Sequence, residues 1–155
     1  SFIISQCNNI TRIKGIVERL CAMFGDELEF EGERFYSFPP AERLAGLQAA
    51  DLAPLRCGYR APYIIDAEPL LRPFAAEDGT AAKKELLKLN GVGEKVANCV
   101  VLFGLYHMEA FPIDVWIRRA LKEHFPPDFD PASLGDCAGL AQQYIFYYAR
   151  SHGNE

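Results

Sequence analysis

Lys95 is the residue of this chain best placed for covalent chemistry, because it lies in the first turn of an expected helix over residues 94–103. That helix is otherwise apolar on nearly every side. The positive end of the helix dipole and a dry environment both favour a neutral lysine amine. Neutral amines are nucleophiles that form Schiff bases. A lysine at such a position is more often a solvated surface charge, but the apolar helix around Lys95 leads us to expect a nucleophile.

Asp114 is the second candidate catalytic residue, and it precedes Val-Trp-Ile-Arg-Arg at the start of a helix expected over residues 115–125. Its simplest role is to cap that helix with its side chain. A carboxylate that caps a helix and faces a cleft stays ionised, and it can then stabilise a sugar that develops positive charge. We expect Asp114 to fill both roles.

A Gly-Val-Gly turn joins two expected helices just before the lysine. Gly91 and Gly93 allow a turn with positive φ, and they let a backbone or a phosphate come close. The amides that open the second helix are unpaired donors, and a phosphate oxygen binds readily there. The residues expected to grip a phosphate backbone are Asn90, Gly91, Val92 and Gly93.

Apolar residues recur with helical spacing along most of the chain. Helices are expected over residues 9–24, 40–48, 60–71, 81–89, 94–103, 115–125 and 134–150, and another is expected to begin near residue 51. Thr80 is the expected cap of the helix over 81–89. Five acids crowd into residues 26–33, and charged and aromatic residues alternate over 29–36, which predicts a strand or hairpin facing water. The pattern is an all-α domain with a small β-hairpin.

Composition narrows the classes of function. At 155 residues and 50% hydrophobic, the chain has the material for one domain with a real core. Neither a membrane span nor a signal peptide is visible. Five cysteines at scattered spacings fit reduced thiols in a cytosolic protein, and none has iron–sulfur spacing. The net charge of −5 is unusual for a DNA binder, but without the five acids of 26–33 there are 16 cations against 16 acids.

Four segments, taken together, resemble the helix-hairpin-helix DNA glycosylases, and within them the bacterial-type 8-oxoguanine DNA glycosylase/AP lyases. They are SFIISQCNNITRIKGIVERLCAMFG (1–25), CGYRAPY (57–63), the hairpin region 86–119 and AGLAQQYIFYYA (138–149). The resemblance covers essentially the whole chain. It implies one helix-hairpin-helix domain over 1–155, with the hairpin motif at about 80–103. Proteins of this family carry an N-terminal β-rich domain, so the chain is expected to be a fragment that lacks it.

The resemblance implies base excision repair of double-stranded DNA that contains 8-oxoguanine opposite cytosine. Lys95 would attack C1′ of a flipped nucleotide and expel the oxidised base, with Asp114 as its electrostatic partner. The Schiff base would permit β-elimination and a nick 3′ to the lesion. The expected protein is a monomer without a cofactor and, if bacterial, lies in the cytoplasm at the nucleoid. No metal-binding side chains are expected, but the hairpin is expected to hold a cation at the main-chain carbonyls of Leu87, Leu89 and Val92.

The resemblance also implies a base pocket. Cys99 lies one helical turn after Lys95 and is expected to pack against one face of the flipped purine. Phe146 is expected on the other face, and Gln142, on the same face of its helix, is expected to read the Watson–Crick edge. Trp116 stands where eukaryotic members carry histidine, and it is expected to line or crowd the pocket.

A second group of residues is implied on the opposite strand. Arg12 and Arg60 match the arginines that read the orphaned cytosine, a task that suits guanidinium forks, and Tyr59 matches the aromatic wedge. Cys7 departs from the pattern, because eukaryotic members carry asparagine there and a thiol is a weaker partner for cytosine. We therefore expect weaker discrimination for cytosine. The residues expected to fill the gap left by the flipped base are Asn8 and Asn9.

Two alternatives stay open on the sequence. A non-catalytic helix-hairpin-helix DNA-binding module would use Lys95 as a phosphate contact, but it leaves Asp114, Gln142 and Phe146 unexplained. The other alternative is a glycosylase of different base preference, such as the thymine glycol, adenine or archaeal-type 8-oxoguanine enzymes. The segments Asn-Asn-Ile-x-Arg, Gly-Tyr-Arg-Ala and Ala-Gln-Gln-Tyr-x-Phe favour the 8-oxoguanine branch.

Overall fold

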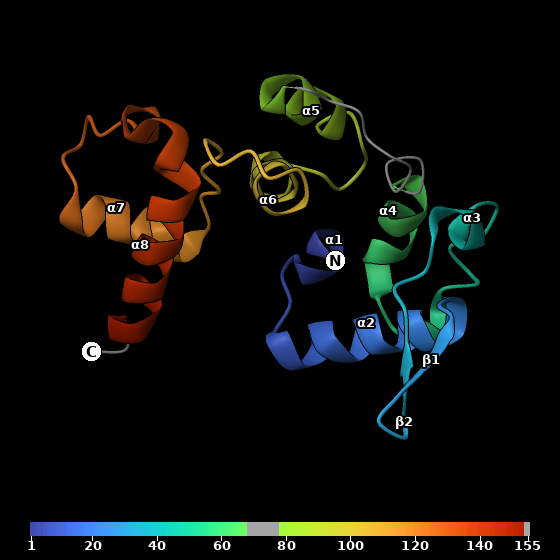
Figure 1. Ribbon diagram of the computed structural model, residues 1–155. Helices are drawn as coiled ribbons and strands as arrows, with labels where there is room; N and C mark the ends of the chain where they lie inside the picture. Colours follow the sequence, from blue (N-terminus) through green and yellow to red (C-terminus); the bar gives the residue numbers. More distant parts are fainter. Residues whose placement is uncertain (68–77, 154–155) are drawn as a thin grey trace. The chain divides into compact units, whose positions relative to one another are not determined.

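The computed structural model describes residues 1–67 and 78–153. Within them the chain is mostly helical, with one two-stranded sheet (Figure 1), so the expectation of an all-α fold with a small β-hairpin is confirmed. The chain divides into two compact units. The first unit is Ser1–Ala75 with Leu89–Gly91, and the second is Ala76–Lys88 with Val92–Glu155. None of the described helices is both long enough and apolar enough to cross a membrane.

The first unit packs short helices against one long helix. Its helices are α1 Phe2–Ser5, α2 Ile10–Phe24, α3 Ala41–Leu44 and α4 Ala61–Asp66, with 3-10 turns η1 Ala53–Leu55 and η2 Gly58–Arg60. Asn9 caps α2, because its side-chain oxygen accepts a hydrogen bond from the Arg12 amide at 2.9 Å. Burial of each aliphatic side chain stabilises the fold by roughly 1.5–3 kcal/mol. The fully buried aliphatic residues of this core are Ile16, Leu20, Leu44, Leu52 and Leu55.

A β-hairpin follows α2. Strands β1 Glu27–Phe30 and β2 Glu33–Tyr36 pair antiparallel, with Leu28 opposite Phe35. The residues between them, Glu31 and Gly32, both have positive φ, as a tight hairpin turn requires. All eight strand residues are exposed, so the predicted water-facing hairpin is confirmed.

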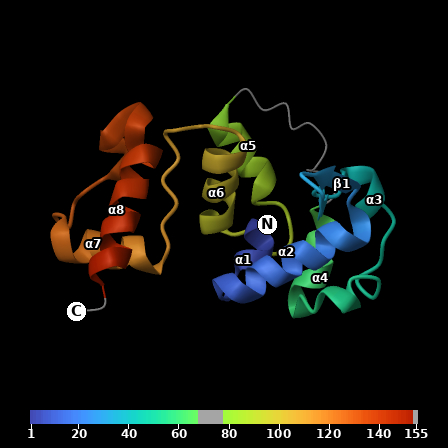
Figure 2. The same cartoon turned by 60° about the horizontal axis from the view of Figure 1, so that its bottom comes forward.

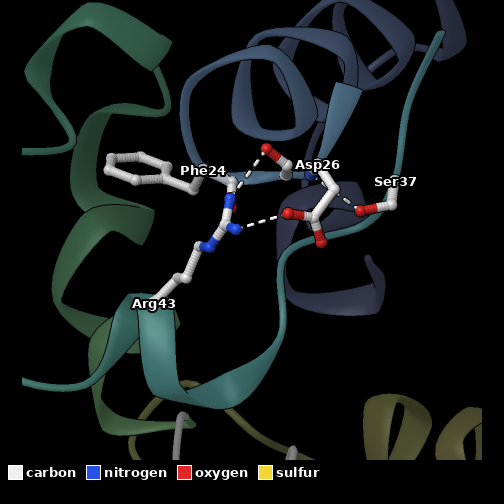
Figure 3. A network of polar contacts seen from close by, with 5 residues as sticks. Phe24, Asp26, Ser37 and Arg43 are labelled. Carbon is white, nitrogen blue, oxygen red and sulfur yellow. Dashed lines mark hydrogen bonds and ion pairs between the residues drawn. The ribbon is translucent and has the colours of Figure 1, made fainter. Parts of the chain in front are cut away.

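Arg43 of α3 fixes the base of this hairpin to the end of α2 (Figure 3). Its guanidinium donates to the Phe24 carbonyl at 3.3 Å and to the Gly25 carbonyl at 2.9 Å, and it pairs with the Asp26 carboxylate. The Asp26 amide in turn donates to the Ser37 hydroxyl at 2.9 Å. The two ends of the hairpin are therefore held by side chains from outside the sheet.

The second unit contains two helix pairs. Its helices are α5 Gly79–Leu86, α6 Glu94–Gly104, α7 Val115–His124 and α8 Ala138–His152, with a 3-10 segment η4 Pro131–Cys137 before α8. Helices α5 and α6 lie side by side and form the predicted hairpin pair (Figure 2), and α7 packs against α8. Phe111, Ile117 and Ala138 form a buried cluster between the last two helices. The start of α8 also approaches the chain before α7, since the Gly139 amide donates to the Met108 carbonyl at 2.6 Å.

Several expected helix boundaries were wrong in the first unit. Helix α3 ends at Leu44 rather than at residue 48, because the chain turns at Gly46 with a φ of +81°. The helix expected near residue 51 is the short 3-10 turn η1. The helix expected over 60–71 is α4, and residues 68–71 lie outside the described part of the chain.

The second unit also differs from the expected boundaries. Helix α5 begins at Gly79 and ends at Leu86, and its cap is Asp78 rather than Thr80. The Asp78 carboxylate accepts a hydrogen bond from the Thr80 backbone amide at 2.9 Å, so Asp78, which precedes the first helical residue, takes the capping role. Helix α8 begins at Ala138 rather than at residue 134, because Gly135 has a φ of +57° and interrupts the helical backbone.

Candidate active site

Lys95 and Asp114 both act on the Cys99 thiol, which lies one turn after Lys95 in α6. Cys99 is 5% exposed, and burial raises the pKa of its thiol. The Asp114 carboxylate raises that pKa further, while the charge of Lys95 and its hydrogen bond to the thiol lower it. Because these effects need short separations, the lysine, the cysteine and the aspartate form one cluster. The net upward shift keeps Cys99 a thiol at neutral pH.

Asp114 caps α7, as the sequence predicts. One of its carboxylate oxygens accepts a hydrogen bond from the Ile117 amide at 2.9 Å. The cap fixes the carboxylate at the N-terminus of α7, and it uses one of the two oxygens. The other oxygen has no recorded partner within the described residues, so it can face a developing positive charge.

A pocket of about 460 Å³ opens beside Lys95. Its lining residues are Glu94, Lys95, Asn98, Ile113, Arg118 and Leu121. The Glu94 carboxylate lies 2.6 Å from the Lys83 ammonium, so its charge is compensated from α5. Sequence reasoning did not assign Asn98 or Arg118 to the site. The signal was present in the spacing, because Asn98 lies three residues after Lys95 and Arg118 lies four after Asp114.

The predicted base-pocket residues of α8 have structural contacts. Gln142 is 4% exposed, and its side-chain amide donates to the Pro112 carbonyl at 3.0 Å. Its side-chain oxygen accepts a hydrogen bond from the side-chain amide of Gln143. Phe146 is half-buried and packs against the cluster around Ile117. These contacts orient both side chains, and their contact with a base stays a prediction.

Trp116 lies at the far end of α8 from Gln142. A side chain added at Gly153 would begin 2.6 Å from the indole ring. Gly153 follows Gln142 by eleven residues, a rise of about 16 Å along a helix. The ring therefore packs at the C-terminal end of α8, and its expected place in the base pocket is not supported by this contact.

The two glycines of the hairpin differ. Gly91 has a φ of +76°, and a side chain there would begin 2.3 Å from the Tyr63 ring. Gly93 has a φ of −98° with an extended backbone, so of the two glycines only Gly91 adopts the positive φ that both allow. The reason is that Gly93 is the N-cap of α6, a position that takes extended geometry. Nothing lies within 4 Å of a side chain added at Gly93, which leaves open space before the helix.

Three residues that the sequence did not single out hold the hairpin turn in the first unit. Gln6 donates its side-chain amide to the Gly91 carbonyl, and Tyr63 packs against Gly91. The side-chain amide of Asn90 donates to the Asp66 carboxylate at 2.7 Å. The turn is therefore anchored to α4 and to the chain that follows α1.

Arg60 is 2% exposed and is a buried clamp in this conformation. Its guanidinium donates to the carbonyls of Gln6 at 3.0 Å, Cys7 at 3.2 Å and Cys57 at 3.2 Å. It also lies 4.4 Å from the centre of the Tyr59 ring. Arg60, the expected cytosine reader, thus donates its hydrogen bonds to main-chain carbonyls. Contact between Arg60 and a base stays a prediction that requires some of these bonds to open.

The other expected opposite-strand residues are more accessible. Arg12 is exposed and donates to the Arg56 carbonyl at 3.2 Å, and Tyr59 is 54% exposed. Asn8 is half-buried, because its amide donates to the Ile4 carbonyl at 3.0 Å. Cys7 is exposed and has a φ of +45°.

The expected site residues fall into both units. The first unit contains Asn8, Asn9, Arg12, Tyr59, Arg60, Asn90 and Gly91. The second unit contains Val92, Gly93, Lys95, Cys99, Asp114, Trp116, Gln142 and Phe146. Within the described residues, no group of three or more histidine, cysteine or acidic side chains could hold a metal ion. A cation at the main-chain carbonyls of Leu87, Leu89 and Val92 stays a prediction.

Comparison with known proteins gives the family. The family model for the HhH-GPD superfamily base excision DNA repair protein matches residues 1–133. The "Probable N-glycosylase/DNA lyase" of Methanothermobacter thermautotrophicus is 32% identical over 187 residues, covering 99% of this chain and 60% of that protein. The "N-glycosylase/DNA lyase" of Saccharomyces cerevisiae is 35% identical over 144 residues, covering 81% of this chain and 38% of that protein.

A solved structure agrees with these matches. The 8-oxoguanine glycosylase/lyase of Clostridium acetobutylicum, in complex with double-stranded DNA containing cytosine opposite 8-oxoG, has a TM-score of 0.82 and 30% identity. The match covers 98% of this chain and 58% of that chain. The chain thus spans 60% of the Methanothermobacter protein, 58% of the Clostridium chain and 38% of the yeast protein. The extent of the family match shows that the chain belongs to the HhH-GPD superfamily of base excision DNA repair proteins.

Proposed function

We propose that this protein is a bifunctional DNA glycosylase/AP lyase that removes 8-oxoguanine paired with cytosine. The observation that carries the proposal is the cluster of Lys95, Cys99 and Asp114, which puts an amine, a thiol and a carboxylate at one point of the second unit. The names of two relatives, each an N-glycosylase/DNA lyase, support the same reaction class. The similarity to the Clostridium acetobutylicum 8-oxoguanine glycosylase/lyase supports 8-oxoguanine as the base that is removed.

The proposed reaction proceeds through the lysine. The flipped nucleotide presents C1′ to the Lys95 amine, which forms a C–N bond as the bond to the base breaks. The departing base takes a proton, and the Asp114 carboxylate stabilises the positive charge that develops on the sugar. Ring opening gives a Schiff base, and loss of a proton from C2′ expels the 3′ phosphate by β-elimination. An amine nucleophile leaves a covalent intermediate, whereas activated water does not.

The same proposal assigns the recognition residues. In the second unit, Cys99 and Phe146 would hold the two faces of the purine, and Gln142 would read its edge. Trp116, which packs beside Gly153, is left out of this pocket. The first unit would bind the opposite strand, with hairpin amides gripping the lesion strand. The opposite-strand residues in this proposal are Asn8, Asn9, Arg12, Tyr59 and Arg60. In this proposal the protein binds double-stranded DNA as a monomer and acts at the nucleoid.

Borohydride trapping tests this proposal directly. The protein is incubated with a duplex holding 8-oxoguanine opposite cytosine, with the undamaged duplex and with a duplex holding an abasic site. We expect lesion-dependent covalent adducts that disappear in Lys95→Gln and persist in Lys84→Gln, which removes an exposed lysine of α5. Residual adduct in Lys95→Gln would place the nucleophile elsewhere.

The three duplexes separate the alternatives. An adduct with the abasic duplex but none with the 8-oxoguanine duplex would retain the lyase and overturn the base preference. No adduct with any duplex, together with lesion-independent binding that weakens with salt, would favour a plain DNA-binding module.

A further inference from the structure

The pocket beside Lys95 is lined by two basic side chains, Lys95 and Arg118, and by one acidic side chain. Its one acidic side chain, Glu94, is paired with Lys83 at 2.6 Å. None of the ion pairs found among the described residues involves Lys95 or Arg118. The pocket also holds Asn98, whose side-chain amide adds neutral donors. A pocket lined by an amide and by two cations that form no ion pair among the described residues is suited to an anion.

The position of Arg118 is fixed by the same helix turn that positions Asp114. Arg118 lies in the first turn of α7, and its amide donates to the Asp114 carbonyl at 2.9 Å. Arg118 therefore starts from a capped, ordered turn, and it lines the pocket that Lys95 also lines. Guanidinium forks bind phosphate in a bidentate manner, whereas an ammonium acts as a point charge.

We propose that Arg118, assisted by Asn98, binds a phosphodiester of the lesion strand next to the nucleotide that Lys95 attacks. The inference rests on the proposed function, because the attacked C1′ would lie beside Lys95 and its flanking phosphates are only a few covalent bonds away. A phosphate held there positions the sugar against the amine, and it does so independently of the base. This phosphate subsite is made by side chains, unlike the grip that hairpin amides provide.

The test combines removal of the arginine charge with removal of single phosphate charges. Binding is measured to an 8-oxoguanine duplex with a 2′-fluorinated lesion sugar that resists cleavage, and methylphosphonates replace one lesion-strand phosphate at a time. We expect Arg118→Gln to weaken binding about tenfold and to lower the salt slope by about one. At one position near the lesion, the methylphosphonate should weaken wild-type binding by a similar factor and cost Arg118→Gln nothing further.

Two further variants serve as controls. Arg150→Gln removes an exposed arginine of α8 that does not line the pocket, and it should keep the wild-type methylphosphonate profile. Arg118→Lys keeps the charge but loses the fork, so it should recover part of the affinity. Thermal melting of each variant checks that the fold is retained.

The outcomes separate this inference from the proposed function. If Arg118→Gln shows the wild-type profile at every position, the subsite is overturned even where lesion binding is intact. If the wild-type protein shows no preference for the lesion, the base assignment fails. The subsite still stands in that case if one methylphosphonate position depends on Arg118 in a duplex with an abasic site.

Discussion

The Tyr63 ring occupies the space where a side chain at Gly91 would begin, with 2.3 Å between the ring and an added Cβ. Gly91 also has a φ of +76°, which side chains rarely adopt. A glycine is thus required here for two independent reasons, close packing and backbone conformation. Gly93, two residues later, has neither constraint.

Gly91→Ala is therefore expected to destabilise the protein by about 2–4 kcal/mol, since the clash and the strained backbone add. Gly93→Ala, the matched control, should cost no more than about 1 kcal/mol, because its backbone is extended and its surroundings are open. Urea denaturation followed by circular dichroism measures both. Equal losses for the two variants would show that Tyr63 moves aside and that Gly91 has no special role.

Arg60→Met should destabilise the fold far more than Arg12→Met. Removal of the Arg60 guanidinium leaves the buried Cys57 carbonyl and the partly buried carbonyls of Gln6 and Cys7 without this donor. An unmet buried carbonyl costs about 1–3 kcal/mol. We expect a total loss of about 3 kcal/mol or more. Arg12 is exposed, and its replacement should change the free energy of unfolding by about 0.5 kcal/mol or less. A small loss for Arg60→Met would mean that the clamp is not the stable arrangement.

Asp114→Asn separates the capping role from the catalytic role. Asparagine caps helices about as well as aspartate, so the free energy of unfolding should change by less than about 1 kcal/mol. The excision rate should fall by about a hundredfold or more, because the neutral amide cannot stabilise a cationic sugar. Single-turnover kinetics on the 8-oxoguanine duplex measure the rate. An unchanged rate would reduce Asp114 to a helix cap.

Cys7→Asn should improve both stability and discrimination. Cys7 has a φ of +45°, a conformation that asparagine tolerates better than other side chains with a Cβ, so a gain of a few tenths of a kcal/mol is expected. The amide can also hydrogen-bond cytosine where the thiol cannot do so as well. Excision rates with cytosine and with adenine opposite the lesion should then differ more than in the wild type. No change in that ratio would show that residue 7 does not face the opposite base.

Local patterns were sufficient for the elements that position the catalytic candidates. Helix α2 with its Asn9 cap, helix α7 with its Asp114 cap and the exposed hairpin all follow from residues close together in sequence. Such caps and alternations are set by the nearest few residues, so they can be read from the local sequence without knowledge of distant contacts. The pairing of Lys95 with Cys99 also follows from helical spacing alone.

Long-range contacts could not be predicted in this way. Gln6 and Gly91 are 85 residues apart, and Arg60 and Gln6 are 54 apart, so no spacing rule connects them. The family resemblance made Arg60 an expected cytosine reader, whereas the fold directs its donors to main-chain carbonyls. Gly93 is a different example. A glycine allows a positive φ, but this one is an N-cap with an extended backbone, a position that other residues can also take.

The exposed β-hairpin has a practical consequence for handling the protein. Five of the 21 acids lie in residues 26–33, and without them the chain would have 16 acids against 16 cations, no net charge. At neutral pH the hairpin should therefore retain the protein on an anion-exchange column, although the proposed ligand is itself a polyanion. Neutralising all five acids of residues 26–33 should abolish that retention. Chromatography on heparin or DNA media would then depend on the cations of the remaining elements.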